Sequence, residues 1–514
     1  MLFALLVAVC SVLLGAALSF VPTTSRAVLG YMRTFATLAA VAVVVTHLLP
    51  EALRELGPLS ILLFLAGWFA PALAHFVGQR STSGRAQHAV LEAGYWGLVV
   101  HHVADGIGLG AYTRLPADQG SHLDVIVALA AHTVPLIAVV ALAYRTTFGA
   151  RSAVLRSLGL ALASVFGIGL SSLVAAGTIE RFAPVIAAVA AGPLLHVVTH
   201  DLTEDPAQTM LARSIDLLVA ALGVAVSLLG VWGSTDPATR EFAHGLVQLT
   251  ERTSLVILVA LAAAAFSLRT AAARESKLAS AALPARALGA ESILLSIALF
   301  GFAAAGLRLL ITAVAIGVFG TLPTDHDDTG ERRHWRARAS DALEHSGPWL
   351  ALGLLIGALL LSVPASALRH HLAGTSIELV IVALVANLTP VAAPAAVLIA
   401  AGLSGLGLGS GAILLFATLA PLVDTLGAAW KPRLAVTATC LLVAAACNHF
   451  GLVTSPLDGA LSQGDLGPRA AIALGVFLLF GIWQRSARLW LSTIVRPPPH
   501  EHEHAHDVHG PHAH

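Results

Sequence analysis

The stretch HHVADGIGLG, residues 101–110, closes an apolar segment that begins near Val90. We expect its polar side chains to lie inside or at the edge of a lipid bilayer. On an α-helix His101 and Asp105 are four residues apart and share one face, with His102 beside them. A charged group at mid-membrane costs about 2.5–3.5 kcal/mol, so such residues usually face a partner or a water-filled path. The glycines that follow would let a neighbouring helix approach closely.

Two imidazoles and one carboxylate on a single helical turn suit a borderline divalent cation such as zinc. The same residues fit a second interpretation, in which two histidines at the membrane interface pair with the aspartate. This segment alone favours neither interpretation, so the choice depends on whether other segments carry similar groups.

Charged residues make up only 11% of the 514 residues, against about 25% in an average soluble protein. The hydrophobic fraction is 57% and the mean hydropathy is +0.83, which predicts an all-α polytopic membrane protein surrounded by the lipid bilayer. A formal net charge of zero argues against a nucleic-acid partner. Cys10, Cys440 and Cys447 all lie in apolar segments, so we expect no disulfide framework and no thiolate metal site.

The first 232 residues contain a series of apolar segments, each long enough to cross a bilayer. These eight segments lie near 2–22, 35–50, 58–77, 89–111, 123–144, 157–177, 182–200 and 213–232. The first has no basic region before it and no convincing cleavage site, so we interpret it as a span and not as a signal peptide. Arginines concentrate in alternate loops, which places the N-terminus outside by the positive-inside rule. We expect a bacterial inner membrane as the location.

Three further spans carry polar side chains where lipid would exclude them. The second ends with His47 and Glu51, again four residues apart. The fifth contains His132 followed by Pro135, which frees a backbone carbonyl one turn back and kinks the helix. The seventh ends with two histidines and an acid, namely His196, His200 and Asp201. Because four spans carry polar side chains of this kind, we expect these side chains to face a common polar interior.

The order of these motifs resembles the ZIP family of divalent-metal transporters. The shared pieces are HLLPEA at 47–52, HHxxDGxxxG at 101–110, HxxP at 132–135, and Ala191-Gly192 leading to Asp201 and Glu204. The resemblance covers about residues 1–232. It implies an eight-span helical bundle with both ends outside and a binuclear metal site between the fourth and fifth spans. Carried over residue by residue, it implies metal binding by His101, His102, Asp105 and His132.

The sequence departs from the family pattern at several of these positions. His102 stands where the family usually has asparagine, and Thr133, Leu136 and Ile137 stand where carboxylates usually follow the fifth-span histidine. The sixth span offers only the hydroxyls of Ser171 and Ser172. A site with fewer anionic ligands should bind a dication more weakly, or bind one ion instead of two.

The second half of the chain has a different pattern. A polar stretch, 233–250, is expected to link the eight-span bundle to a second membrane domain over 251–496. The apolar run 288–322 contains Gly306 and Arg308 and is too long for one ordinary span. Together with the basic loops on both sides of it, this length predicts a tight hairpin of two short spans.

A broken or re-entrant helix is expected at 376–402, which is interrupted by NLTP at 387–390 and by Pro394. Proline at this depth is typical of helices that break around a cavity. In segments 348–357 and 387–411 this half is similar to the predicted-permease superfamily that includes ArsP-like metalloid exporters. Members of that superfamily often carry cysteines at the break, where this chain has an asparagine, a threonine and two prolines.

A histidine-rich tail occupies residues 497–514. Residues 500–514 contain seven histidines and three acids, among them His502, His504 and His506. Such a composition indicates metal binding by a segment that is disordered without its ligand, and charge places it in the cytoplasm. An engineered tag is the alternative, but the acids and the proline run at 497–499 argue against it.

The first functional hypothesis is therefore a transporter of divalent metal ions, zinc above others, that alternates access to a His/Asp site and is not an enzyme. A second is an intramembrane zinc hydrolase, in which His101, His102, Asp105 and His200 hold a zinc with one open position. A third is a membrane metal sensor or scaffold. The oligomeric state, a homodimer among the alternatives, is left open.

Overall fold

This computed structural model describes residues 2–20, 26–57, 59–79, 85–112, 123–173, 209–233, 237–266, 288–319, 335–363, 375–426, 430–450 and 466–495, with isolated positions between 181 and 195. All regular secondary structure in these ranges is helical. The side chains of some helical residues, including His47 and His132, lie outside the description. The expected site residues His196, His200 and Asp201, and the tail with His502, His504 and His506, also lie outside the described residues.

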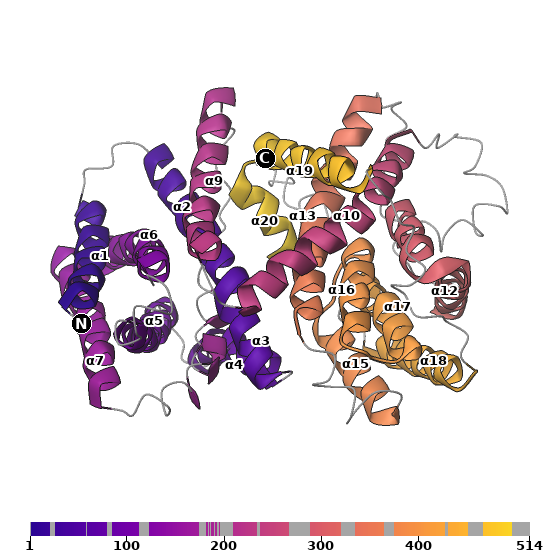
Figure 1. The fold of residues 1–514 in the computed structure, drawn as a ribbon, viewed down its shortest axis with the longest axis horizontal. Coiled ribbons are helices and arrows are strands. Elements are labelled where there is room, and N and C mark those ends of the chain that lie inside the picture. The colour runs from indigo at the N-terminus through magenta and orange to yellow at the C-terminus, as the bar shows by residue number, and fades with distance from the viewer. Residues whose placement is uncertain are drawn as a thin grey trace, which may run out of the picture.

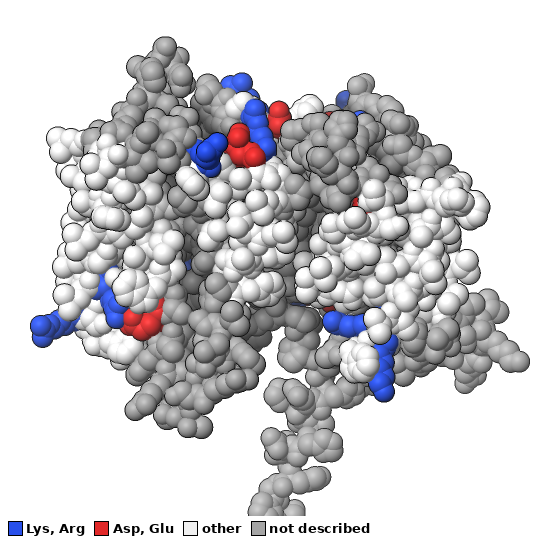
Figure 2. Space-filling model, turned by 90° about the horizontal axis from the view of Figure 1, so that it is seen from below, with Lys and Arg blue, Asp and Glu red and all other residues white. Residues whose placement is uncertain are grey.

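Within the described ranges, eight helical segments are long and apolar enough to cross a membrane. Large apolar side chains such as Leu162, Phe166 and Leu173 on α7 (Ala150–Leu173) are exposed, as expected for a surface that contacts lipid. Figure 2 shows uncharged residues over most of the described surface in that view, with charged side chains in a few separate groups. The chain is an all-α polytopic membrane protein, and this confirms the fold class predicted from composition.

Four helices form a bundle at one end of the molecule (Figure 1). They are α1 (Leu2–Phe20), α5 (Arg85–Tyr112), α6 (Leu123–Phe148) and α7. The stretch 101–110 lies on α5, which packs along α7, while α1 packs against both α6 and α7. The polar groups of that stretch therefore lie inside a bundle of otherwise apolar helices.

Glycines allow α5 and α7 to cross closely. A Cβ atom at Gly106 would overlap the carbonyl oxygen of Ser164, and one at Gly167 would overlap the carbonyl oxygen of Val103. Gly110 lies in the same way against the hydroxyl of Ser171. This is the close approach that the glycines of the stretch predicted.

A middle group of helices lies between this bundle and the second half of the chain (Figure 1). It comprises α2 (Arg26–Val43), the π-helical turn η1 (Val44–Leu48), α3 (Leu49–Leu56), α4 (Leu59–Gln79) and α9 (Met210–Gly233). Pro50, in the first turn of α3, has no N–H to offer the carbonyl of Thr46. That carbonyl accepts a hydrogen bond at 3.3 Å from the hydroxyl of Thr239, which belongs to the second half.

The second half begins with α10 (Pro237–Phe266), so most of the linker expected over 233–250 is helical instead. Buried Thr239, Phe242, Gly245 and Leu249 recur every three or four residues, which is the period of an α-helix with one buried face. The intervening charged residues are exposed and gave the stretch its linker-like composition. The linker was predicted from the polar composition of this exposed face.

The remaining helices of the second half are α12 (Ala290–Phe319), α13 (Trp335–Leu361), α15 (Ser376–Leu388), α16 (Ala393–Gly405), α17 (Ser410–Leu426), α18 (Trp430–Phe450), α19 (Leu466–Arg485) and α20 (Ala487–Val495). Among them α16 packs against α12, α13 and α17. Every residue of α16 from Ala393 to Gly402 is buried. The break expected near NLTP at 387–390 is present, because α15 ends at Leu388 and α16 begins only at Ala393.

The apolar run expected to form a hairpin is broken at Gly301, whose backbone is non-helical (φ 82°, ψ 173°). Nη1 of Arg308 donates to the carbonyl oxygen of Ser292 at 3.3 Å. In a straight helix these two residues would be about 24 Å apart, which is farther than an arginine side chain reaches. The two parts of α12 therefore fold back toward each other at Gly301, as the length of the run predicted.

The two halves of the chain are joined by a buried polar contact. Asp216 on α9 accepts hydrogen bonds from the Thr34 hydroxyl at 2.6 Å and from the Ala487 N–H at 3.0 Å. Nε of Arg488, on α20, donates to the same Thr34 hydroxyl at 3.1 Å. Asp216 is thus bound by groups from α2 and from the first turn of α20, and its carboxylate fixes the second half against the first.

Candidate metal centre

His101 and Asp105 form a buried pair on α5. The His101 Nε2 and Asp105 Oδ2 atoms are 3.3 Å apart, and the two side chains are 4% and 11% exposed. The pairing follows from their spacing of four residues, which places both on one face of the helix. The two side chains are therefore in contact, and metal binding by them stays a prediction.

The imidazole of His102 contacts α7. Its Nδ1 lies 3.1 Å from the hydroxyl oxygen of Ser164, which in turn donates to the carbonyl of Leu160 at 3.3 Å. The direction of the hydrogen bond between His102 and Ser164 depends on the tautomer of the imidazole. In the tautomer that donates from Nδ1 to the serine hydroxyl, Nε2 is the nitrogen that can bind a metal ion.

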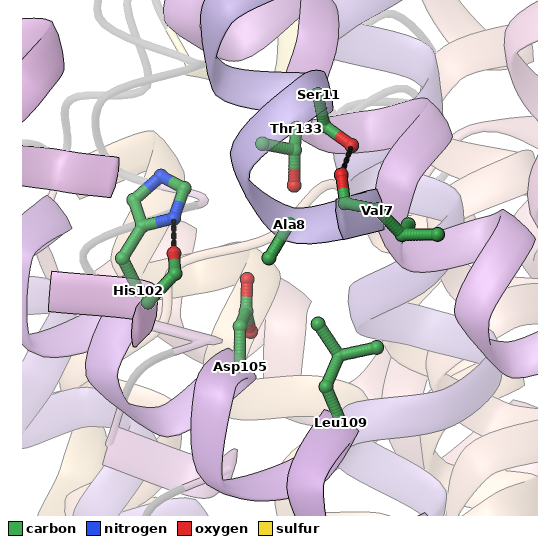
Figure 3. A pocket seen from close by; sticks show the side chains of 8 residues that line it. Val7, Ala8, Ser11, His102, Asp105, Leu109 and Thr133 are labelled. Carbon is green, nitrogen blue, oxygen red and sulfur yellow. Dashed lines mark hydrogen bonds between the residues drawn. The ribbon is translucent and has the colours of Figure 1, made fainter. Parts of the chain in front are cut away.

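A small cavity separates the polar face of α5 from α1 and α6. Its lining consists of Val7, Ala8, Ser11, His102, Asp105, Leu109, Thr133 and Ser164. In Figure 3 the carboxylate of Asp105 points across the cavity toward α1, with Thr133 and Ser11 on the far side. One carboxylate, one imidazole and several hydroxyls therefore converge on one space between four helices.

This set of side chains can hold a single divalent cation only with additional ligands. Among the described residues no group of three or more His, Cys, Asp or Glu side chains is placed to hold a metal ion. Thr133 lines the cavity, and its neighbour His132 lies on the same turn of α6, with its side chain outside the description. Hydroxyl oxygens and water would have to supply the remaining ligands.

The other expected ligands are not brought to this cavity by the described residues. His47 lies on η1 and Glu51 on α3, next to the second half of the chain and not on any of the four helices that line the cavity. Leu136 and Ile137, at positions where the ZIP family usually has carboxylates, are buried in the apolar core with Tyr144 and Leu160. These two residues pack the bundle and face no polar partner in that cluster.

A charged cluster that was not predicted from the sequence is centred on Glu92 of α5. Glu92 lies nine residues before His101, which is about 13 Å along the helix. Nη2 of Arg156 is 2.6 Å from Oε1 of Glu92, and the Tyr144 hydroxyl donates to the same oxygen at 3.3 Å. The Arg156 guanidinium also lies over the Tyr95 ring, 4.5 Å from its centroid. The carboxylate of Glu92 inside an apolar segment was the available signal in the sequence.

Comparison of the chain with protein-family models, with curated proteins and with solved structures gives no match. The fold and the cavity therefore define only a class: a polytopic α-helical membrane protein with a buried His/Asp site inside one of its helical bundles.

Proposed function

We propose that the protein transports divalent metal ions, with zinc as the first candidate, by alternating access to the cavity between α1, α5, α6 and α7. The observation that carries the proposal is the convergence of His102, Asp105 and Thr133 on one buried space, with His101 paired to the same aspartate. Ionisable groups inside a membrane bundle usually mark an ion path. The resemblance of residues 47–52, 101–110 and 132–135 to ZIP motifs supports the same function.

The ligand set predicts modest affinity. Asp105 is the only carboxylate among the described residues that line the cavity, and imidazole and hydroxyl ligands bring no charge. A bound dication would keep a net positive charge in a medium of low dielectric constant, which disfavours a second ion. We therefore propose one ion per site. Weak binding is compatible with transport, because the ion must leave the site in every cycle.

Histidine must be neutral to bind a metal ion, so protons compete with the metal at this site. Metal affinity should fall as the pH drops and imidazoles become protonated. A hydrolase is less well supported: besides Asp105 and His102, the described lining has only hydroxyl and alkyl side chains, which leaves no separate general base for a zinc-bound water.

The proposed location is a bacterial inner membrane, with the N-terminus outside and the tail in the cytoplasm. The arginines of alternate loops support this orientation. Single cysteines introduced at 80–88 and at 274–286 should be labelled from the same side as the tail. Labelling of the tail from the opposite side would contradict the orientation.

The decisive experiment compares Asp105→Asn with the parent chain after removal of residues 500–514 from both, so that tail histidines do not mask the result. Zinc binding is measured by calorimetry, and uptake by a zinc dye trapped in proteoliposomes. Glu92→Gln is the matched control, since it makes the same chemical change on the same helix at a carboxylate that pairs with Arg156.

We expect Asp105→Asn to abolish uptake and Glu92→Gln to keep it. Equal zinc binding by the parent and Asp105→Asn would show that the site holds no metal. A parent protein that binds zinc through Asp105 but does not move it would be a sensor or scaffold.

A further inference from the structure

Arg308 is a buried cation in the centre of the second half. It lies in the second part of α12 and is 1% exposed. Its four Nη hydrogen bonds all go to neutral oxygen atoms: the carbonyl and hydroxyl of Ser292, the hydroxyl of Ser296 and the carbonyl of Ala417. The fifth donor, Nε, has no hydrogen-bond acceptor among the described residues.

The bond to Ala417 has a local cause. Pro421 lies inside α17 and has no N–H, so the carbonyl of Ala417, four residues earlier, lacks its helical partner. Nη2 of Arg308 donates to that carbonyl at 2.7 Å. This contact explains why an arginine side chain is held here, but a neutral donor would serve the carbonyl as well. The positive charge itself is not explained by it.

Among the described residues no carboxylate compensates this charge. Glu291, one residue before Ser292, accepts a hydrogen bond from Ser346 at 3.0 Å. Glu344 pairs with Arg485 at 3.2 Å, and Glu378 accepts from the N–H of Gly409 at 2.5 Å. Guanidinium stays protonated in proteins, and an isolated charge in a membrane interior is strongly unfavourable. Within the described residues, the second half therefore carries a fixed positive charge without a counter-ion.

The N-terminus of α16 is a second source of positive potential, and the hydroxyl of Ser292 connects it to Arg308. Ser292 accepts from Nη2 of Arg308 at 3.1 Å and donates to the carbonyl of Ala393 at 3.2 Å. Ala393 begins α16, whose first turn is buried and has no side-chain cap. The first N–H groups of a helix have no acceptor inside it, and they attract anions. The uncapped turn and the guanidinium thus act on the same region.

We propose that Arg308 and the first turn of α16 form a binding site for a small inorganic anion, of the halide or oxyanion class, in the second half of the protein. The anion would accept from Nε of Arg308 and from serine hydroxyls, and would supply the missing negative charge. The same positive field repels a free dication, so this half does not offer a second path for the metal.

The guanidinium is buried in this structure, so an anion would reach it only after a movement of the surrounding helices, and two non-helical segments lie near it in the chain. Gly301 interrupts α12 seven residues before Arg308, and residues 389–392 are non-helical immediately before α16. Both elements that carry the positive charges therefore begin next to a non-helical segment, as in transporters whose broken helices surround their substrate.

The test uses the purified full-length protein with two probes, radiolabelled chloride and radiolabelled sulfate, in an equilibrium binding assay. Arg308→Gln should weaken binding of the anion by about tenfold or more, as expected for the loss of a charged hydrogen bond. Arg308→Lys should give an intermediate loss, because the charge stays while the planar donor pair is lost. Arg485→Gln is the matched control: it removes a cation of the same half that is already paired with Glu344, and binding should not change.

Two measurements keep the proposal testable if Arg308→Gln does not fold. Crystals of the parent protein in bromide should show anomalous scattering at hydrogen-bond distance from Arg308. In addition, Ala392→Asp places a tethered carboxylate at the N-cap of α16 and should compete with the free anion. The proposal is overturned if neither probe binds saturably to the parent, if bromide lies elsewhere, or if Ala392→Asp binds the anion as the parent does. Asp105→Asn should leave anion binding intact, so failure of the metal site and failure of the anion site are distinguishable.

Discussion

The two halves of the protein bury opposite charges in similar surroundings. In the first half Asp105 is paired with His101 at 3.3 Å and lies beside a cavity that His102 and hydroxyl groups also line. In the second half Arg308 is enclosed by serine hydroxyls and backbone carbonyls and has no acid beside it among the described residues. An acid with imidazoles suits a cation, and a guanidinium with hydroxyls suits an anion. If both proposals hold, the two halves select ligands of opposite sign.

In each half, a proline leaves one backbone carbonyl without its helical hydrogen bond, and a side chain from another segment donates to that carbonyl. Pro50 leaves the carbonyl of Thr46 to the hydroxyl of Thr239, whereas Pro421 leaves the carbonyl of Ala417 to Arg308. The first contact uses a neutral donor and the second uses a cation for the same task. Since a hydroxyl suffices at Thr46, the charge at Arg308 points to a role beyond capping a carbonyl.

The largest expected effect is a double dissociation between the halves. In the chain without residues 500–514, Asp105→Asn should weaken zinc binding by about ten- to hundredfold, because the only carboxylate of the cavity is neutralised, and should leave chloride binding unchanged. Arg308→Gln should do the reverse. Calorimetry with zinc and radiolabelled chloride binding on the same preparations would check both. A variant that lowers both affinities together would show that the halves share one site.

The backbone at the break of α12 gives the next largest effect. Gly301 has a positive φ with extended ψ, a region that only glycine adopts readily, so Gly301→Ala should cost about 1–3 kcal/mol. Gly306 is the matched control on the same helix: no atom lies within 4 Å of a Cβ built there, and Gly306→Ala should be neutral or add up to about 1 kcal/mol. Thermal unfolding in detergent measures the difference. Equal stability of the two variants would contradict a strained break at Gly301.

Restoring a carboxylate should act in the opposite direction to Asp105→Asn. Thr133 lines the cavity on α6, across from Asp105. Thr133→Glu adds a second anionic ligand, and we expect zinc to bind about tenfold more tightly. Thr133→Gln is its control, since it adds the same bulk without charge. Tighter binding by both variants would mean that size, and not charge, limits the site.

Much of the fold could be predicted from the sequence, for reasons that are local. Apolar segments of sufficient length predict spans, glycines at 106 and 110 predicted the close crossing with α7, and prolines predicted the break before α16. The first turns of α10 were missed because their buried face is narrow and their exposed face is charged. The helical period of Thr239, Phe242 and Leu249 was present in the sequence but was outweighed by composition.

The candidate site could be predicted only where it is local. The pair of His101 and Asp105 follows from a spacing of four residues, but Ser11 and Ser164 come from other helices, and a single serine in an apolar span carries no signal of its own. Arg308 was visible as a charge in an apolar run. That it lacks a counter-ion depends on how α12 folds back and on which carbonyl Pro421 frees, and no sequence pattern encodes these contacts.

The smallest expected effect concerns the hydrogen bond between His102 and Ser164. Ser164→Ala removes the hydroxyl that lies 3.1 Å from Nδ1 of His102, a group that would orient the imidazole as a metal ligand requires. One neutral hydrogen bond contributes about 0.5–1.5 kcal/mol, so zinc affinity should fall about two- to tenfold. Ser172→Ala is the matched control on the same helix, because Ser172 is exposed and donates to the carbonyl of Gly169. Zinc titrations of both variants without the tail would separate the outcomes: if His102 is a ligand, Ser164→Ala alone loses affinity, and if His102 only packs against α7, neither variant changes zinc binding.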